Sequence, residues 1–206
     1  MITASLAPLL PGVSVADPAL LKGGYSREMW AFDATLADGT RRPLILCADS
    51  AEGVVGSGDQ ALTRAQEAAL LQLVHRAGLP VPEVLGAGDA ASPMGRPYLV
   101  MERGAGTAAV GPLFRDPWYT ARADELAARL AAILAAIHAV DATPVLGPPP
   151  RAADVAPREL MRWSTELAAT PQARTPVVDR AVAWLGDHLP PPPQRVTLVH
   201  ADFRTG

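Results

Sequence analysis

The segment REMWAFDATLADGTRRPLILCADS, residues 27–50, shows the clearest structural pattern in the chain and decides which fold we expect. Trp30 and Phe32 stand two positions apart, so their side chains share one face if the segment is extended. An Asp-Gly pair at 38–39 is a typical turn sequence, and the alternation of apolar residues resumes at Leu44. The segment therefore predicts a β-hairpin.

The next segment along the chain has the features of a single helix. Thr63 and Gln66 have the spacing of a capping box at its start. Leu70 and Val74 follow one turn apart and contribute to an apolar stripe. Gly78 suits the position just beyond a helix C-terminus. We therefore predict a helix that begins after Thr63 and ends before Gly78.

Strand and helix patterns continue to the end of the sequence. Residues 97–106 (PYLVMERGAG) predict a short buried strand that glycines interrupt. Apolar residues at helical spacing predict a long helix over 120–140. Prolines suited to a first turn open shorter predicted helices over about 157–168 and 176–188. The RVTLV segment, residues 195–199, predicts a return to strand.

This order of elements predicts an α+β fold with two lobes joined by a hinge. We expect a β-rich N-terminal lobe with one helix over residues 1–103, the hinge included. Residues 104–206 are expected to form a helical C-terminal lobe that ends in a His-x-Asp motif at 200–202. Ligands commonly bind between two such lobes.

The composition excludes several classes of protein. Of the 206 residues 49% are apolar, which is enough for a core, and the formal net charge is −3. This mild charge indicates neither a nucleic-acid partner nor a membrane surface. Cys47 is the only cysteine, so no internal disulfide and no cysteine-rich zinc site is expected. No apolar run approaches about 18 residues, and we expect a cytoplasmic protein.

Chemistry is indicated by the His200-x-Asp202 motif, which follows the predicted strand at 195–199. A carboxylate at a strand end is rigidly held and can accept a proton from an attacking hydroxyl group. The alternative interpretation is that Asp202 only caps a turn while His200 forms an ordinary hydrogen bond at the strand end. The motif by itself does not separate the two.

Two further segments have features of a nucleotide site. Gly23, Gly24 and Ser26 precede the hairpin, and backbone N–H groups in such a glycine turn can approach phosphate oxygens closely. An ordinary tight turn would have the same sequence. Residues 100–106 are equally compatible with a plain strand end and with a hinge whose backbone groups face a purine.

The order of these segments resembles the aminoglycoside phosphotransferase family, the small-molecule branch of the protein-kinase-like fold. The resemblance covers nearly the whole chain. The segments most similar to recurrent family segments are GGYSREMWAFDA, GLPVPEVLGAGD, YLVMERGAG, LAAIHAVD and LVHADFRTG. The resemblance implies transfer of the γ-phosphoryl group of ATP or GTP to a hydroxyl group of a small molecule. A nucleotide and this acceptor are therefore the expected partners.

The resemblance also implies roles for individual residues. Asp202 would be the catalytic aspartate that orients or deprotonates the acceptor hydroxyl, and His200 would brace its loop. Glu67 would pair with a basic residue on the third strand, whereas most helical glutamates are merely solvated. The implied nucleotide-binding residues are Gly23, Gly24 and Ser26 over the phosphates, Cys47 on the third strand, Glu67 on the helix, and Glu102 and Arg103 near the adenine.

Cys47 is the first departure from the family pattern, because it stands where a Lys or Arg is expected. A neutral thiol cannot replace a permanent cation beside phosphate oxygens, nor can it pair with Glu67. Possible substitutes in the sequence are Arg41, Arg42 and Arg64. Two alternatives therefore stay open: a pseudokinase-like module that binds nucleotide or a partner without catalysis, and a plain α+β protein in which the His-x-Asp motif is coincidental.

The second departure concerns the C-terminus. The family pattern has an Asn five residues after the aspartate, and that position would lie just beyond Gly206. We therefore expect a C-terminally truncated chain with an incomplete helical lobe. We also expect Mg²⁺ to act in the full-length parent, with its protein ligands absent here. Negligible phosphotransfer and an exposed apolar strand edge at 195–199 would follow. The acceptors that the resemblance implies are antibiotic, amino alcohol, sugar and homoserine-like hydroxyls.

Overall fold

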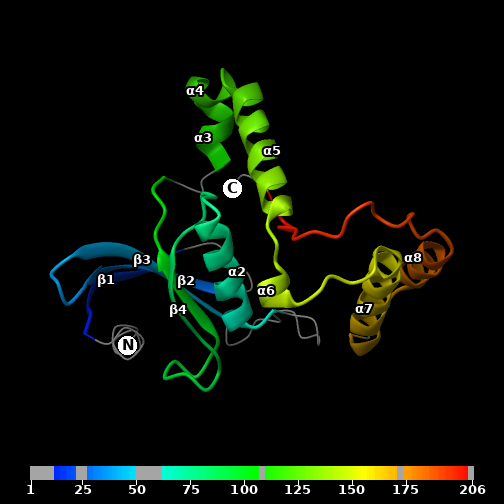
Figure 1. Ribbon diagram of the computed structural model, residues 1–206, viewed down its shortest axis with the longest axis horizontal. Coiled ribbons are helices and arrows are strands. Elements are labelled where there is room, and N and C mark those ends of the chain that lie inside the picture. The colour runs from blue at the N-terminus through cyan, green and yellow to red at the C-terminus, as the bar shows by residue number, and fades with distance from the viewer. Residues whose placement is uncertain (1–11, 22–26, 50–61, 107–109, 171–173, 204–206) are drawn as a thin grey trace.

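The computed structural model describes residues 12–21, 27–49, 62–106, 110–170 and 174–203. Within these ranges the first half of the chain forms a five-stranded antiparallel sheet with one helix, α2, against it (Figure 1). The strand order is β1-β2-β3-β5-β4. The strands are β1 (Ser14–Leu21), β2 (Arg27–Thr35), β3 (Arg41–Asp49), β4 (Val84–Gly88) and β5 (Tyr98–Glu102).

Helices dominate the second half. They are α3 (Val110–Arg115), α4 (Pro117–Thr120), α5 (Ala123–Ala139), α6 (Thr143–Leu146), the short 3₁₀ helix Ala152–Asp154, α7 (Val155–Ala169) and α8 (Pro176–Asp187). The helices α5, α7 and α8 confirm those predicted over 120–140, 157–168 and 176–188. Helices α7 and α8 contact each other and lie away from the sheet (Figure 1). Among the described helices, none has the length and apolar character needed to cross a bilayer.

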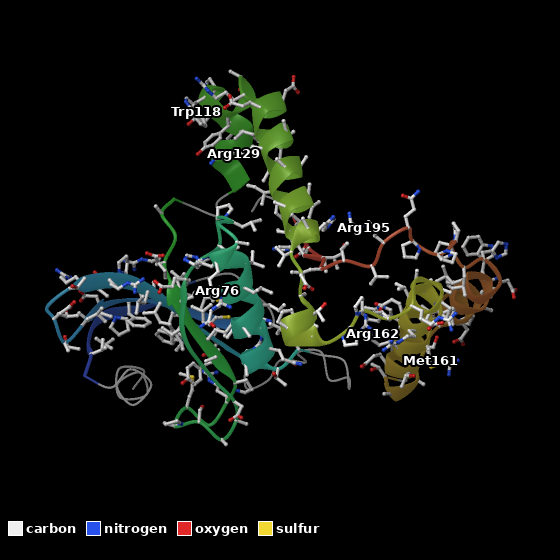
Figure 2. The ribbon with its side chains drawn as sticks, viewed as in Figure 1. Arg76, Trp118, Arg129, Met161, Arg162 and Arg195 are labelled. Atoms are coloured by element: carbon white, nitrogen blue, oxygen red, sulfur yellow. The ribbon has the colours of Figure 1, made fainter. Side chains whose placement is uncertain are left out.

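Much of the helical half stays in contact with solvent. Met161 on α7 is 70% exposed and Trp118 on α4 is 52% exposed, and Figure 2 shows them on separate parts of the molecule. On α5 only Ile137 is fully buried, although its apolar residues share one face. The dense core therefore belongs to the sheet.

The predicted hairpin is confirmed as β2 and β3. Phe32 pairs with Leu44 and Trp30 pairs with Leu46, so the alternating apolar residues of the two strands meet. Gly39 adopts a φ of +84° in the connecting turn, a conformation that favours glycine. The local alternation and the turn sequence were sufficient to define the register.

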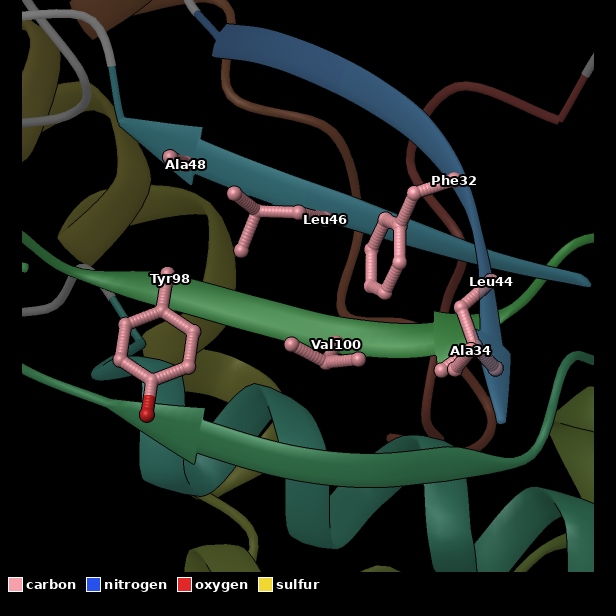
Figure 3. Packing of buried hydrophobic residues seen from close by; sticks show 7 residues of the cluster. All are labelled: Phe32, Ala34, Leu44, Leu46, Ala48, Tyr98 and Val100. Atoms are coloured by element: carbon pink, nitrogen blue, oxygen red, sulfur yellow. The ribbon is translucent and has the colours of Figure 1, made fainter. Parts of the chain in front are cut away.

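The sheet buries both of its faces. One face contains a cluster of Phe32, Ala34, Leu44, Leu46, Ala48, Tyr98 and Val100 (Figure 3). On the other face Cys47 and Leu99 pack with Ala68 of α2 and with Val84 of β4. Successive residues of a strand point to opposite faces, so Leu46 and Cys47 belong to different clusters. Cys47 therefore faces α2.

Helix α2 (Arg64–Arg76) confirms the predicted capping box. The Gln66 backbone N–H donates to the Thr63 hydroxyl at 3.1 Å, and the Thr63 backbone N–H donates to the Gln66 side chain at 3.0 Å. Leu70 and Val74 are buried, as the stripe predicts. Gly78 has a φ of +81° just beyond the helix end. This cap places the first turn of α2, with its charged residues, against the ends of β2 and β3.

The predicted strand at 195–199 is wrong. These residues run without regular secondary structure, and side-chain packing holds them instead: Leu198 contacts the cluster of Val74, Leu79 and Ile137. A strand requires a partner strand, which an apolar pattern in one segment cannot guarantee. The exposed strand edge expected there is therefore wrong as well.

Candidate functional site

Charged residues gather where the start of β2 and the end of β3 lie against the first turn of α2. Arg27 begins β2 and is the register partner of Asp49, which ends β3. The Arg27 guanidinium donates to both carboxylate oxygens of Glu67, with Nη1–Oε1 at 2.9 Å and Nη2–Oε2 at 3.3 Å. Such a bidentate contact fixes the orientation of both groups.

Arg64 completes this cluster from within α2. Its Nε donates to Asp49 Oδ1 at 3.0 Å, and its Nη1 and Nη2 contact Glu67 and Asp49, respectively. The Arg64 side chain is only 5% exposed. A buried guanidinium must be paired, because removing it from water without partners is very costly. Asp49 and Glu67 meet this requirement, and the contact with Asp49 ties β3 to α2.

Cys47 lies beside this cluster and is itself 3% exposed. Burial raises the pKa of its thiol, although the neighbouring Arg27 and Arg64 guanidinium groups act in the opposite direction. Burial is the largest single influence on the pKa of Arg27 and lowers it, but the charge and hydrogen bonding of Glu67 and Cys47 together raise this pKa above its ordinary value. The thiol is therefore neutral near pH 7, while the arginines are charged.

The cations beside Glu67 are therefore Arg27 of β2 and Arg64 of α2, and the residue of β3 at this position is the neutral Cys47. Of the three substitutes suggested by the sequence, Arg64 reaches Glu67, whereas Arg41 pairs with Asp33 and Arg42 pairs with Glu83. Sequence reasoning missed Arg27. Its position was inferable from the hairpin, because Met29 pairs with Cys47 and Arg27 lies two residues before Met29, on the same face.

Glu102 and Arg103 lie at the end of β5, next to the start of β3. Their backbone N–H groups donate to Glu83 O and Pro43 O, each at 2.9 Å. The Arg103 side chain donates to Asp33 at 2.7 Å, and the Glu102 carboxylate is exposed, 3.9 Å from Arg42. Any contact of these two residues with a purine must therefore use groups other than their backbone N–H donors.

The two groups of predicted nucleotide-binding residues lie at separate positions along β3. Leu44 pairs with Glu102, whereas Cys47 pairs with Leu99. Three residues of extended strand span about 10 Å. The structure thus brings Cys47 and Glu67 together, and it keeps Glu102 and Arg103 away from them. Gly23, Gly24 and Ser26 lie outside the described residues.

The His200–Asp202 segment is anchored on both sides. Leu198 before it and Phe203 after it pack against a buried cluster that includes Val74 of α2 and Ile137 of α5. The His200 ring packs edge-on against Phe203, with ring centroids 5.4 Å apart. Asp202 is exposed to solvent and takes part in further interactions of its own. The motif thus lies where α2 and the helical half meet.

Ala201, between the two motif residues, has a φ of +67°. The left-handed region is unfavourable for a residue with a Cβ atom, at a cost of roughly 1–2 kcal/mol. Strain of this kind persists only where the surrounding structure imposes it, and it clusters at functional sites. Packing of Leu198 and Phe203 on either side supplies that constraint.

No group of three or more His, Cys, Asp or Glu side chains suited to hold a metal ion occurs in the described part of the chain. Mg²⁺ is commonly held by one or two carboxylates together with nucleotide phosphates, an arrangement that needs no such group.

Comparisons with known proteins identify relatives. The model of the phosphotransferase enzyme family matches residues 20–206. Mouse acyl-CoA dehydrogenase family member 10 is 31% identical over 144 residues, which are 68% of this chain and 13% of that protein. A solved structure from Ralstonia eutropha JMP134, named as a candidate aminoglycoside phosphotransferase, aligns with a TM-score of 0.59 at 20% identity.

That alignment covers 99% of this chain and 57% of the Ralstonia chain. At this identity the likeness bears on the fold alone, and it confirms the expected α+β protein-kinase-like fold. The chain thus spans little more than half of the solved relative and a small part of the mouse relative.

Proposed function

The chain belongs to the phosphotransferase enzyme family, and we propose that its protein transfers the γ-phosphoryl group of ATP or GTP to a hydroxyl group of a small molecule. The main support is the family match over residues 20–206. The structure adds a buried set of paired charges at the start of α2 and a His-x-Asp segment that is anchored by packing of Leu198 and Phe203. Phosphoryl transfer depends mainly on positioning and on neutralising charge, which both features favour.

Asp202 and His200 are the proposed catalytic residues. In this proposal the Asp202 carboxylate orients the acceptor hydroxyl and accepts its proton as the oxygen attacks the γ-phosphorus. His200 braces the segment through its contact with Phe203. Ala201, between them, has a left-handed backbone conformation that is unfavourable for stability. Its retention supports a functional role for this segment.

The proposed nucleotide site lies along β3. In this proposal the adenine or guanine ring lies near Glu102 and Arg103, and the phosphates extend toward Glu67 and Cys47. The spacing of about 10 Å between these positions is compatible with a nucleotide stretched along the strand. Gly23, Gly24 and Ser26 would cover the phosphates with their backbone N–H groups.

We assign the activity to the whole protein and expect negligible turnover from this 206-residue chain alone. The reason is that the chain spans only part of its relatives, 57% of the solved Ralstonia chain and 13% of the mouse protein. We also propose a cytoplasmic location, where nucleoside triphosphates are abundant and a single thiol stays reduced. Nucleic acid and membrane are not proposed as partners.

Cys47 favours a second candidate function. Because its thiol is neutral and buried, β3 offers no cation at this position. A protein of this kind could bind a nucleotide or a protein partner without transferring phosphate. The two proposals differ in turnover, not in nucleotide binding.

The test uses the intact protein with ATP and GTP and a panel of hydroxyl compounds: aminoglycosides, amino alcohols, sugars and hydroxy amino acids. Nucleotide consumption that depends on one of these compounds supports the phosphotransferase. Saturable nucleotide binding with no consumption across the panel supports the binding module. If neither ATP nor GTP binds, the phosphotransferase proposal and the binding-module proposal are both rejected.

A further inference from the structure

Arg27 and Arg64 contact the same carboxylate but differ in exposure. Arg64 is buried, and all three of its nitrogens are used by Asp49 and Glu67. Arg27 is 34% exposed, and it donates two hydrogen bonds to Glu67. A guanidinium has five N–H donors, so Glu67 and the adjacent Cys47 thiol do not exhaust it. Arg27 can therefore bind a second anion while it stays paired.

The place of Arg27 in the chain also points toward a phosphate. It is the first residue of β2 and follows the Gly23–Gly24 pair by three positions in sequence. It faces α2 together with Cys47, at the end of the sheet opposite to Glu102. A second arginine at the same end of the sheet, Arg96, donates to Glu28. Glu28 follows Arg27 directly in β2, so its side chain points to the opposite face of the sheet.

We propose that Arg27 binds the phosphates of the nucleotide, and that Glu67 and the buried Arg64–Asp49 pair position its guanidinium. The proposal rests on the proposed function. An arginine is charged at any physiological pH, and its planar fork matches the oxygens of phosphate. Arg64 fixes Glu67, and Glu67 in turn orients Arg27, so the contact is preorganised. A cation from β2 thus replaces the one that β3 lacks.

The proposal is tested by comparing a nucleoside triphosphate with its nucleoside. The affinities of the intact protein for ATP and adenosine, and for GTP and guanosine, are measured by calorimetry. In this proposal the phosphates contact Arg27 and the nucleoside does not, so a loss confined to the triphosphate isolates the phosphate contact. We expect Arg27→Gln to weaken triphosphate binding by about 10- to 100-fold and to leave nucleoside binding unchanged.

Arg96→Gln is the matched control, because it removes the same charge from the same end of the sheet and takes the arginine partner from a carboxylate, that of Glu28. It should change neither affinity. Arg27→Lys should keep most of the triphosphate affinity. Cys47→Lys in the Arg27→Gln background returns a cation to β3 beside Glu67, and it should restore triphosphate binding. A purely structural role for Arg27 predicts that Arg27→Gln weakens triphosphate and nucleoside binding equally.

Arg27→Gln leaves Glu67 with one partner and could prevent folding. In that case Arg27→Gln combined with Glu67→Gln removes both charges, and the same comparison is made with that protein. Equal triphosphate affinity in wild type and variant, or equal loss for triphosphate and nucleoside, overturns the role of Arg27 and leaves the proposed function standing. Failure of the wild-type protein to bind either triphosphate rejects the proposed function and this role together.

Discussion

The Arg64 guanidinium donates from Nε to Asp49 Oδ1 at 3.0 Å and so joins the first turn of α2 to the end of β3. Arg64 is the residue that follows the Thr63 cap, which fixes its position at the start of the helix. A local signal, the capping box, thereby determines where a long-range ion pair forms. The same turn holds Glu67, which Arg27 contacts from β2.

Replacement of Arg64 by Met should be strongly destabilising. It keeps most of the apolar stem but leaves two carboxylates short of a partner in a largely buried setting. We expect the free energy of unfolding in urea to fall by roughly 3–5 kcal/mol. Arg174→Met is the control, because its pair with Asp179 is exposed and should be worth at most about 1 kcal/mol. Equal effects of the two substitutions would show that the buried pairs are not structural.

Two replacements of Ala201 should show whether its left-handed backbone conformation is strained. Glycine has no Cβ atom, so Ala201→Gly should leave stability unchanged or raise it by up to about 1 kcal/mol. Ala201→Val should lower it by more than about 1 kcal/mol, because a β-branched residue fits this conformation poorly. Chemical denaturation measures both. A tolerated valine would mean that the left-handed conformation is not retained in solution.

The buried thiol of Cys47 should make stability fall at alkaline pH. Burial raises its pKa in the folded protein, so above the ordinary value of about 8.5 the unfolded chain loses this proton first. The stability that the protonated thiol contributes is fully present below that pH. It is lost as the pH rises through the pKa of the thiol in the folded protein. Unfolding curves of wild type and Cys47→Ala between neutral pH and pH 10 would reveal it. A decline with the same slope in both proteins would assign the effect to other groups.

The elements predicted correctly are those whose signals are local. The hairpin has its alternation and its turn at Gly39, and α2 has its capping box and its stripe. Strands β1 and β4 were missed for equally local reasons. An Asp-Pro pair at 17–18 interrupts β1, where Asp17 has a φ of +51° and the register shifts. Two glycines in β4 resemble a turn sequence.

The errors and omissions concern properties that no single segment contains. Residues 195–199 have a strand-like composition, but no strand pairs with them in the described part of the chain, and Leu198 packs against the cluster of Val74, Leu79 and Ile137. Arg27 and Glu67 are forty residues apart, so their contact depends on the register of the hairpin and on the placement of α2 together. The family resemblance implied that Glu67 pairs with a cation at the position of Cys47, whereas the cations that contact Glu67 are Arg27 and Arg64.

The most direct test of the account is transfer of label from γ-labelled ATP or GTP to a hydroxyl acceptor by the intact protein, compared with Asp202→Asn. The account predicts a phosphorylated acceptor with wild type. In the variant it predicts a rate lower by about 10²- to 10⁴-fold, because the proton acceptor is lost, with nucleotide affinity unchanged. Equal rates for the two proteins, or nucleotide binding without a phosphorylated acceptor under any condition, would contradict it.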